Sequence, residues 1–232
     1  MLNLFKIKDN SDFRDQWVIK KLKSLKNGLK MLDAGCDSQR YRKCCNHLEY
    51  TSQDFAQYDG KGDGIGLHSG RMNYPKIDYI GNIWKINEKD NTFDIILCTE
   101  VIEHIPYPNE TIKEFSRLLK SGGELLITAP FISLPHMTPY YYYSGFYKQW
   151  YIDMAKENNM KVIEIIENGN AYDFVAQELN RVANYSNNKF MKILLKLYFR
   201  IFTIPILNFL SLQDTKSKEF LTFGYQVVMR KE

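Results

Sequence analysis

The chain has 232 residues, of which 44% are hydrophobic and 25% charged, and its formal net charge is +4. This length favours one large domain with a substantial core. The mild positive charge gives no reason to expect nucleic acid as a partner, because basic and acidic residues are interleaved. The four cysteines lack a Cys-x-x-Cys spacing and the four histidines are scattered, so neither disulfides nor a metal site is expected.

The same composition bears on where the protein works. The N-terminus has no charged-then-apolar signal pattern. No run of about 18 uncharged apolar residues occurs, so no helix that spans a membrane is expected. With reduced cysteines, these features predict a cytoplasmic protein.

The first predicted elements lead to a turn after a strand. Apolar residues recur at helical spacing over 11–26, with Ser11 as a suitable N-cap. A short apolar strand over 29–33 follows, then Gly35 and a short helix predicted over 38–46. A second strand is predicted over 49–55. In open α/β sheets, ligands bind at the carboxyl ends of such strands, and Gly35 can take the positive φ that a tight turn needs.

Alternation of strands and helices continues to residue 130. Strands are predicted over 77–83, 93–98 and 124–129, and a helix over 109–119 that Lys120-Ser121-Gly122-Gly123 ends. Between the second and third strands, the segment 59–66 has glycine at every second position. Its spacing fits neither a dinucleotide-binding turn nor a P-loop, so we interpret it as a flexible surface loop rather than a phosphate cradle. The pattern predicts βαβ units and a parallel sheet.

The rest of the chain contains a helix predicted over 146–158, strands over 161–167 and 223–230, and an insertion over 171–218. Within the insertion, a basic stripe at helical spacing crosses an otherwise apolar helix. Three interpretations of residues 189–210 stay open: peripheral contact with an anionic membrane, a lid over the substrate, or a homodimer interface. The stripe consists of Lys189, Lys192, Lys196 and Arg200.

Four segments, in this order, resemble the signatures of class I S-adenosylmethionine-dependent methyltransferases. They are residues 32–36, Asp54, residues 93–105 with Pro108, and residues 118–127. The resemblance implies an α/β, Rossmann-like, doubly wound fold with a seven-stranded, mostly parallel sheet and an antiparallel last strand. Residues 1–232 are then a single methyltransferase domain, with the helical insertion 171–218 before the last strand.

The resemblance also implies S-adenosylmethionine as the cofactor. Asp54 is placed to accept hydrogen bonds from both ribose hydroxyls. Asp33 and the amides near Gly35 meet the amino and carboxylate groups, and Asn82 and Ile83 hold the adenine. Phe55, Thr99 and Glu100 complete the predicted cofactor site. Asp37 and Gln39 stand where the family usually has glycines; Asp37 would repel the cofactor's carboxylate or bind its amino group.

Methyl transfer to a hydroxyl needs an acceptor for the proton, and histidine suits this task near neutral pH. His104 follows the fourth predicted strand, and His136 lies in the loop after the fifth. Each is a candidate catalytic residue, with a structural hydrogen-bonding role as the alternative. Glu100 and Glu103 are candidates for cofactor binding or helix capping.

Tyrosines and tryptophan then cluster over 140–151, which suits sugar or flat rings or ordinary packing. The segment 129–150 resembles methyltransferases of bacterial glycan biosynthesis. We therefore predict methyl transfer to a hydroxyl of a small-molecule or glycan acceptor, with lipid-linked acceptors included, in the cytoplasm or at the inner face of the membrane. The alternatives are a non-catalytic methyltransferase-like module that binds a membrane or partner protein, and an NAD-dependent oxidoreductase. The absence of G-x-G-x-x-G disfavours the oxidoreductase.

Overall fold

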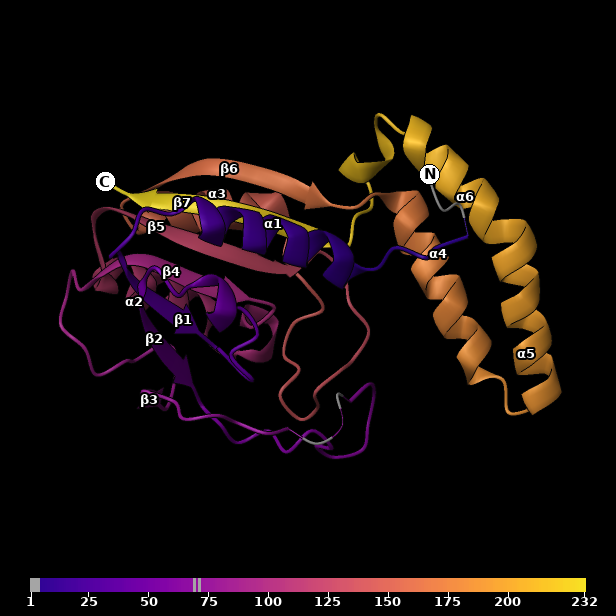
Figure 1. The fold of residues 1–232 in the computed structure, drawn as a ribbon, viewed down its shortest axis with the longest axis horizontal. Coiled ribbons are helices and arrows are strands. Elements are labelled where there is room, and N and C mark those ends of the chain that lie inside the picture. The colour runs from indigo at the N-terminus through magenta and orange to yellow at the C-terminus, as the bar shows by residue number, and fades with distance from the viewer. Residues whose placement is uncertain (1–4, 69, 71) are drawn as a thin grey trace. The chain divides into compact units, whose positions relative to one another are not determined.

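The computed structural model describes residues 5–68, 70 and 72–232 (Figure 1). It divides into two compact units. The sheet unit comprises Gln16–Ile166 and Tyr225–Glu232, and the helical unit comprises Met1–Asp15 and Glu167–Gly224. The candidate site residues predicted from the sequence all belong to the sheet unit.

Seven strands of the described chain form one sheet in the order β3-β2-β1-β4-β5-β7-β6. The pairs β1–β2, β1–β4, β2–β3 and β4–β5 are parallel, and β7 runs antiparallel to its neighbours (Figure 1). This arrangement confirms the predicted Rossmann-like α/β fold. The strands are β1 (Lys30–Ala34), β2 (Glu49–Asp54), β3 (Tyr79–Ile80), β4 (Phe93–Thr99), β5 (Leu119–Pro130), β6 (Met160–Asn168) and β7 (Gly224–Lys231).

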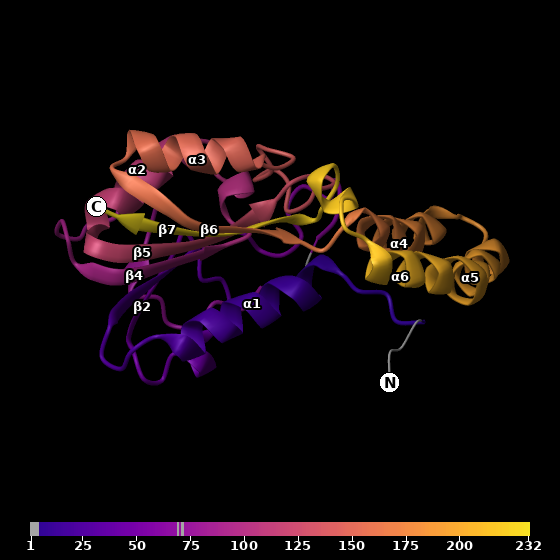
Figure 2. The same ribbon diagram turned by 90° about the horizontal axis from the view of Figure 1, so that it is seen from above.

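Helices cover both faces of the sheet, with α1 (Asn10–Ser24) on one side and α2 (Pro108–Leu118) and α3 (Lys148–Glu157) on the other (Figure 2). Alternate residues of each central strand supply two cores, as a sheet buried on both faces requires. Leu32 and Ile96 pack on the side of α2 and α3. Met31 and Leu97 pack on the side of α1, against Val18 and Leu22.

Three predicted elements differ in the structure. The helix predicted over 38–46 is reduced to a 3₁₀ turn, η1 (Arg42–Cys44), because Asp37 and Gln39 have positive φ and so break a helical path. The strand predicted over 77–83 contains only the two residues of β3. Strand β5 begins at Leu119, so Lys120 to Gly123 lie within it, at a register shift opposite Phe93 and Ile95.

The first helix also begins differently. Helix α1 starts at Asn10 rather than after Ser11. The side chain of Asp9 accepts a hydrogen bond from the backbone N–H of Asp12 at 3.0 Å and another from the Ser11 hydroxyl at 2.7 Å. Asp9 therefore caps the helix in place of the predicted Ser11.

In the helical unit, α4 (Ala171–Val182) and η3 (Ala183–Tyr185) precede α5 (Lys189–Tyr198). A π-helical turn, η4 (Phe199–Thr203), joins α5 to α6 (Ile204–Gln213), and η5 (Ser217–Glu219) leads back to β7. Residues Lys189–Gln213 thus form one helical stretch that is long and apolar enough to cross a membrane, by length and composition only. The helix reaches this length because it continues past Arg200 and Pro205, where α6 places its proline in the first turn. That no helix spans a membrane stays a prediction, because length and composition alone do not place this helix in a bilayer.

Candidate functional site

The carboxyl ends of β1 and β2 meet at the turn that follows β1. The backbone N–H of Gly35 donates to the carbonyl oxygen of Gln53 at 2.9 Å. The Asp54 carboxylate accepts hydrogen bonds from the backbone N–H groups of Asp37 and Ala56, both at 2.8 Å. The structure therefore brings Asp33, Gly35, Asp37 and Asp54 together, as the parallel pairing of β1 and β2 requires.

The turn keeps a glycine-like backbone although it has only one glycine. Gly35 has φ of 73°, and a Cβ there would lie 2.5 Å from a Val101 side-chain carbon. Asp37 and Gln39 have φ of 46° and 57°, in the left-handed region. The Gln39 side chain is buried and donates to the carbonyl oxygen of Lys76 at 2.7 Å. Asp37 and Gln39 thus adopt the left-handed conformation that glycine takes most easily.

Three carboxyl groups give this turn an acidic character. The pKa of Asp33 is raised to about 6, mainly by burial. The Tyr50 hydroxyl donates a hydrogen bond to the Asp33 carboxylate at 2.5 Å, which lowers this pKa in part. Desolvation also raises the pKa of Asp37 and of Asp54, and the charge of Asp54 adds to the rise at Asp37. Buried carboxylates this close together are stabilised by a cation. The site therefore suits a ligand that carries a positive group.

The remaining predicted cofactor residues lie at the ends of β2, β3 and β4. Phe55 follows β2, and its ring meets that of Tyr140 edge-on with centroids 4.9 Å apart. Asn82 is exposed, whereas Ile83 is buried in the core on the α2 side of the sheet. Thr99 ends β4. Glu100 has φ of 53° and accepts a hydrogen bond from the Thr128 hydroxyl at 3.0 Å.

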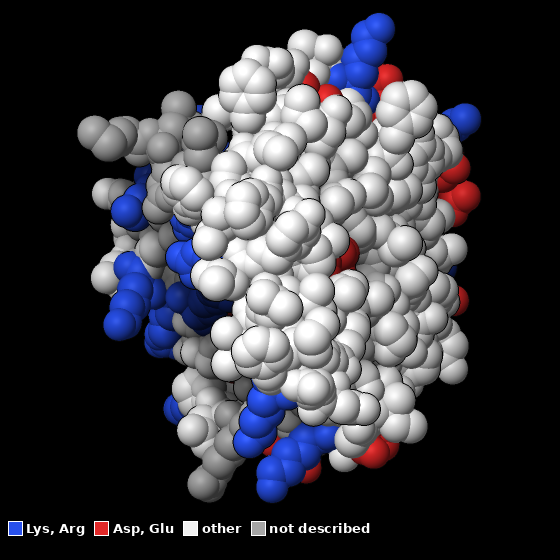
Figure 3. Space-filling view, turned by 90° about the vertical axis from the view of Figure 1, so that its right-hand side faces the viewer, with Lys and Arg blue, Asp and Glu red and all other residues white. Residues whose placement is uncertain are grey.

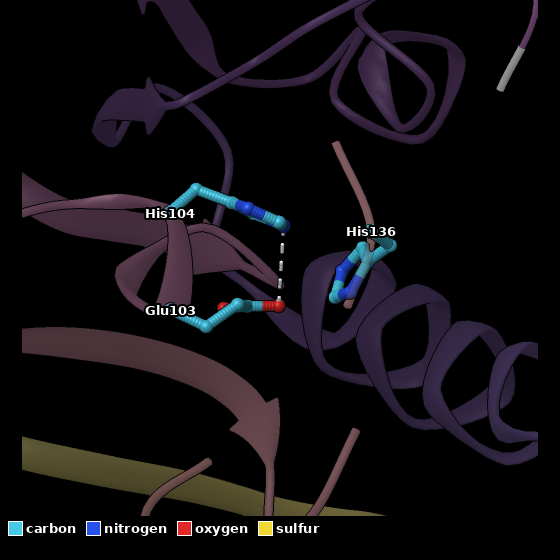
Figure 4. Close-up of side chains that lie close together, drawn as sticks. All are labelled: Glu103, His104 and His136. Atoms are coloured by element: carbon cyan, nitrogen blue, oxygen red, sulfur yellow. Dashed lines mark ion pairs between the residues drawn. The ribbon is translucent and has the colours of Figure 1, made fainter. Parts of the chain in front are cut away.

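His104 and His136, 32 positions apart in sequence, lie side by side. Their ring centroids are 4.5 Å apart, and the rings meet edge-on. His104 belongs to a 3₁₀ turn after β4, η2 (Ile102–His104), and His136 to the loop after β5. The buried carboxylate of Glu103 completes the group, with one oxygen 3.7 Å from Nε2 of His104 (Figure 4). One ligand atom from each of the three residues lies within 4.8 Å of the others.

Burial and, to a smaller extent, the neighbouring His136 lower the pKa of His104 to about 4. His104 is therefore neutral near pH 7, so its contact with Glu103 is not one between opposite charges. The sequence placed His104 and His136 in loops at the same edge of the sheet. It did not predict that their rings meet or that Glu103 joins them.

The glycine-rich segment 59–66 lies against the loop that carries His136. The N–H of Leu67 donates to the carbonyl oxygen of Pro135 at 3.0 Å, and the N–H of Met137 donates to the carbonyl oxygen of Leu67 at 2.9 Å. A Cβ at Gly66 would lie 2.4 Å from the Pro135 oxygen. Residues 61–67 are exposed, as the prediction of a surface loop implies, and the segment also pairs its backbone with the loop that carries His136.

The aromatic cluster serves two purposes. Tyr151 and Phe146 are buried, and Tyr151 packs against Tyr225 with ring centroids 6.1 Å apart, so these rings belong to the core. Tyr142 and Tyr143 are exposed, and their backbone N–H groups donate to the carbonyl oxygen of Glu103 at 3.0 and 3.1 Å. The loop after β5 is thereby fastened to the turn that carries Glu103 and His104.

The sequence comparison identifies the family. A family model described as a methyltransferase domain matches residues 10–176. The chain belongs to this methyltransferase family. The assignment confirms the class I methyltransferase resemblance, with S-adenosylmethionine as the methyl donor, and removes the NAD-dependent oxidoreductase from consideration.

Sequence relatives of this methyltransferase match it over part of their length. A ubiquinone biosynthesis O-methyltransferase of Idiomarina loihiensis is 29% identical over 106 residues, which cover 44% of this chain and 42% of that protein. An uncharacterised protein of Methanocaldococcus jannaschii, MJ0638, is 44% identical over 46 residues, 20% of each chain. The chain thus spans less than half the length of these relatives.

Solved structures share the fold at low sequence identity. The [4+2]-cyclase SpnF superimposes with a TM-score of 0.59 at 14% identity, over 99% of this chain and 85% of that one. Phosphoethanolamine N-methyltransferase 2 of Haemonchus contortus, in complex with S-adenosylmethionine, superimposes with a TM-score of 0.53 at 15% identity, over 94% of this chain and 52% of that one. The named activities of these two proteins differ, so the likeness establishes the fold and leaves the reaction to the site.

Proposed function

We propose that this protein transfers the methyl group of S-adenosylmethionine to a hydroxyl oxygen of a small, amphiphilic acceptor. The observation that carries the proposal is the pairing of an acidic turn, at Asp33 and Asp54, with the His104–His136 pair in the loops after β4 and β5. The carboxyl ends of neighbouring parallel strands lie at one edge of a sheet, so both groups lie at the edge where ligands of such sheets bind. The relatives named O-methyltransferases support an oxygen acceptor.

The cofactor supplies an activated methyl group on a positively charged sulfur. In the reaction the S–CH₃ bond breaks, an O–CH₃ bond forms, and the hydroxyl proton leaves. Asp54 would hold the ribose hydroxyls, and Asp33 would bind the amino group. Positioning of this kind contributes roughly 7–11 kcal/mol in favourable cases. The histidine pair accepts the hydroxyl proton.

For the acceptor, we propose a glycan or other hydroxylated head group linked to a lipid. Tyr142 and Tyr143, whose backbone N–H groups bond to Glu103, have exposed rings that suit sugar or flat rings. The outer surface of α5 and α6 supports the lipid link. Figure 3 shows a broad face of uncharged residues with both basic and acidic residues at its margins. The exposed apolar side chains of residues 189–213 include Phe190, Ile193, Leu194, Leu197, Tyr198, Ile201, Phe202, Ile206, Phe209 and Leu212.

We propose that this surface rests on an anionic membrane, at the inner face of the bilayer. No acidic residue occurs between Lys189 and Gln213, while Lys189, Lys192, Lys196 and Arg200 flank the apolar side chains. Phe190 and Ile193 leave 71% and 66% of their surface to solvent. An apolar face with a basic flank and no acidic residue matches the charge and apolarity of an anionic lipid surface.

Contact in the plane of the membrane is favoured over crossing it. The opposite face of α6 carries polar groups fixed within the helical unit. The Asn208 side chain donates to the carbonyl oxygen of Lys6 at 2.9 Å, and Ser211 donates to the Asp173 carboxylate at 3.0 Å. Lys8 lies 3.5 Å from the same carboxylate. Moving this charged set into hydrocarbon would be costly, whereas interfacial contact leaves it in place.

Calorimetric titration with S-adenosylmethionine and S-adenosylhomocysteine, followed by transfer of a radiolabelled methyl group to prenyl-diphosphate-linked saccharides and prenylated catechols, tests the reaction. Binding with transfer to either acceptor class supports the proposal. Binding without transfer to any hydroxyl acceptor, or no binding at millimolar cofactor, overturns it. The second result favours a non-catalytic binding module.

Co-flotation with vesicles of phosphatidylcholine, with and without phosphatidylglycerol, tests the membrane surface. We expect flotation only with the anionic vesicles, and its loss in the double variant Ile193→Ser, Leu197→Ser. Ile163→Ser on β6, which replaces a side chain that is also exposed, is the matched control. Absence of flotation would overturn the membrane proposal. If the wild type is then a dimer and the double variant a monomer, the homodimer interface is favoured.

A further inference from the structure

We propose that Glu103, His104 and His136 bind a divalent transition-metal ion, with Zn²⁺ and Mn²⁺ as the ions that best suit the donor set. The binding itself is independent of the proposed methyl transfer. Its role in the reaction rests on that function. The three side chains project from two separate segments into one space (Figure 4).

Backbone carbonyl groups orient both imidazole rings. Nδ1 of His104 lies 2.7 Å from the carbonyl oxygen of Tyr140, and Nδ1 of His136 lies 2.9 Å from that of Leu134. A carbonyl oxygen only accepts hydrogen bonds, so Nδ1 carries the proton in each ring and Nε2 keeps its lone pair. A histidine that binds a metal through one ring nitrogen characteristically donates from the other to a carbonyl or carboxylate oxygen.

The ligand atoms have nearly the spacing that an ion requires. Donor atoms about 2.1 Å from a tetrahedral Zn²⁺ lie about 3.4 Å apart. The oxygen of Glu103 is 3.7 Å from Nε2 of His104, and all three ligand atoms lie within 4.8 Å of one another. Small side-chain rotations, mainly of the partly exposed His136, close the remaining distance.

The chemistry of the donors also points to a cation. The Glu103 carboxylate and two imidazole lone pairs face one another, and all three accept rather than donate. Glu103 is fully buried, with 0% of its surface exposed, and His104 is largely buried. A buried site with such donors is stabilised by a positive ion. Two imidazoles and one carboxylate select transition metals, because Mg²⁺ and Ca²⁺ prefer all-oxygen ligands.

Three protein ligands leave a coordination position open, as in catalytic zinc sites. The acceptor's hydroxyl oxygen would take that position. An ion there lowers the pKa of the bound hydroxyl, so its proton passes to water before the O–CH₃ bond forms. In the loaded protein, therefore, the histidine pair would act through the ion rather than as a free base.

Binding can be measured without any turnover. We expect the full chain, first stripped with a chelator, to take up one equivalent of Zn²⁺ or Mn²⁺ with a dissociation constant at or below about 1 μM in calorimetry. Co²⁺ would give the visible absorption of a four-coordinate site. Glu103→Gln and His136→Gln should each weaken binding at least tenfold. His136→Gln guards against misfolding, because His136 is only partly buried, and His47→Gln is the matched control.

Uptake of less than about a tenth of an equivalent, or unchanged affinity in both ligand variants, would overturn the metal site. Methyl transfer at full rate by protein shown to be metal-free would remove its catalytic role and leave the proposed function standing. Stoichiometric ion binding without methyl transfer to any acceptor would keep the metal site and overturn the proposed function.

Discussion

Asp54 Oδ2 accepts a hydrogen bond from the backbone N–H of Asp37 at 2.8 Å. The carboxylate at the end of β2 therefore fixes the turn after β1, in addition to its proposed role at the cofactor ribose. The same carboxylate also accepts from the N–H of Ala56 at 2.8 Å. One side chain thus ties together the two strand ends that form the cofactor side of the site.

Replacing Asp54 should therefore weaken cofactor binding strongly. A hydrogen bond to a charged group contributes about 1.5–3 kcal/mol, so Asp54→Ala should lower the affinity for S-adenosylmethionine by roughly 10- to 100-fold or more. Calorimetric titration measures the change, and circular dichroism confirms that the variant is folded. Asp153→Asn, on the surface of α3, is the control. Equal affinity in Asp54→Ala and wild type would place the ribose elsewhere.

Cofactor affinity should depend on pH through Asp33. Its pKa of about 6 means that the carboxyl becomes protonated as the pH falls below 6, and it then attracts the cofactor's amino group less. The Tyr50 hydroxyl lowers this pKa. Tyr50→Phe should raise it, move the midpoint of the affinity profile to higher pH and weaken binding at pH 7. Tyr79→Phe, whose hydroxyl bonds to Glu88 instead, should leave the profile unchanged. A flat profile from about one unit below to about two units above the Asp33 pKa of about 6 would contradict this role of Asp33.

Asp33 should also make stability depend on pH. Cofactor affinity rises with pH, whereas the contribution of Asp33 to stability falls. A pKa raised from 3.8 to about 6 means that the folded state binds the proton more tightly than the unfolded state. The contribution of Asp33 to the free energy of unfolding therefore falls as the pH rises from about 4 to about 6, by about 3 kcal/mol in total. Urea unfolding of the cofactor-free protein at several pH values, compared with Asp33→Asn, measures it. A wild-type-like slope in Asp33→Asn would assign the dependence to other groups.

A side chain at Gly35 should disturb the turn through Val101. Gly35→Ala combines the strain of a positive φ with a contact of 2.5 Å, whereas Gly28→Ala has a similar φ of 77° and nothing within 4 Å. We expect Gly35→Ala to weaken cofactor binding at least tenfold and to destabilise more than Gly28→Ala. Val101→Ala in the same chain should restore part of the loss, with a coupling energy of about 1–2 kcal/mol in a double-mutant cycle. Strict additivity would show that the contact does not matter.

The glycine-rich segment offers a test with a built-in control. Gly66→Ala would place a Cβ 2.4 Å from the Pro135 oxygen, whereas Gly64→Ala, with φ of 79° against 82°, meets nothing within 4 Å. We expect Gly64→Ala to cost about 1 kcal/mol from backbone strain alone. Gly66→Ala should cost more and speed hydrogen exchange at the Leu67 and Met137 amides. Equal exchange rates in the two variants would argue against the backbone pairing.

The sequence by itself determined the sheet, the order of its elements and the acidic turn. Strand periodicity and the Gly-containing turn are local properties, and parallel pairing necessarily brings the ends of β1 and β2 together. Asp33 and Asp54 could therefore be placed without coordinates. The helix predicted over 38–46 was wrong. Positive φ at Asp37 and Gln39 prevents it, and the sequence does not reveal a positive φ at residues other than glycine.

Only the tertiary structure decided which residues of the loops meet. Glu103 and His104 come together with His136 because two loops at neighbouring strand ends are held by backbone hydrogen bonds, and no sequence period records such bonds. The exposure of the outer face of α5 and α6 was decided in the same way. The sequence of an apolar helix is the same whether the helix is buried or exposed. In α6, the hydrogen bonds of Asn208 and Ser211 show which side packs inward.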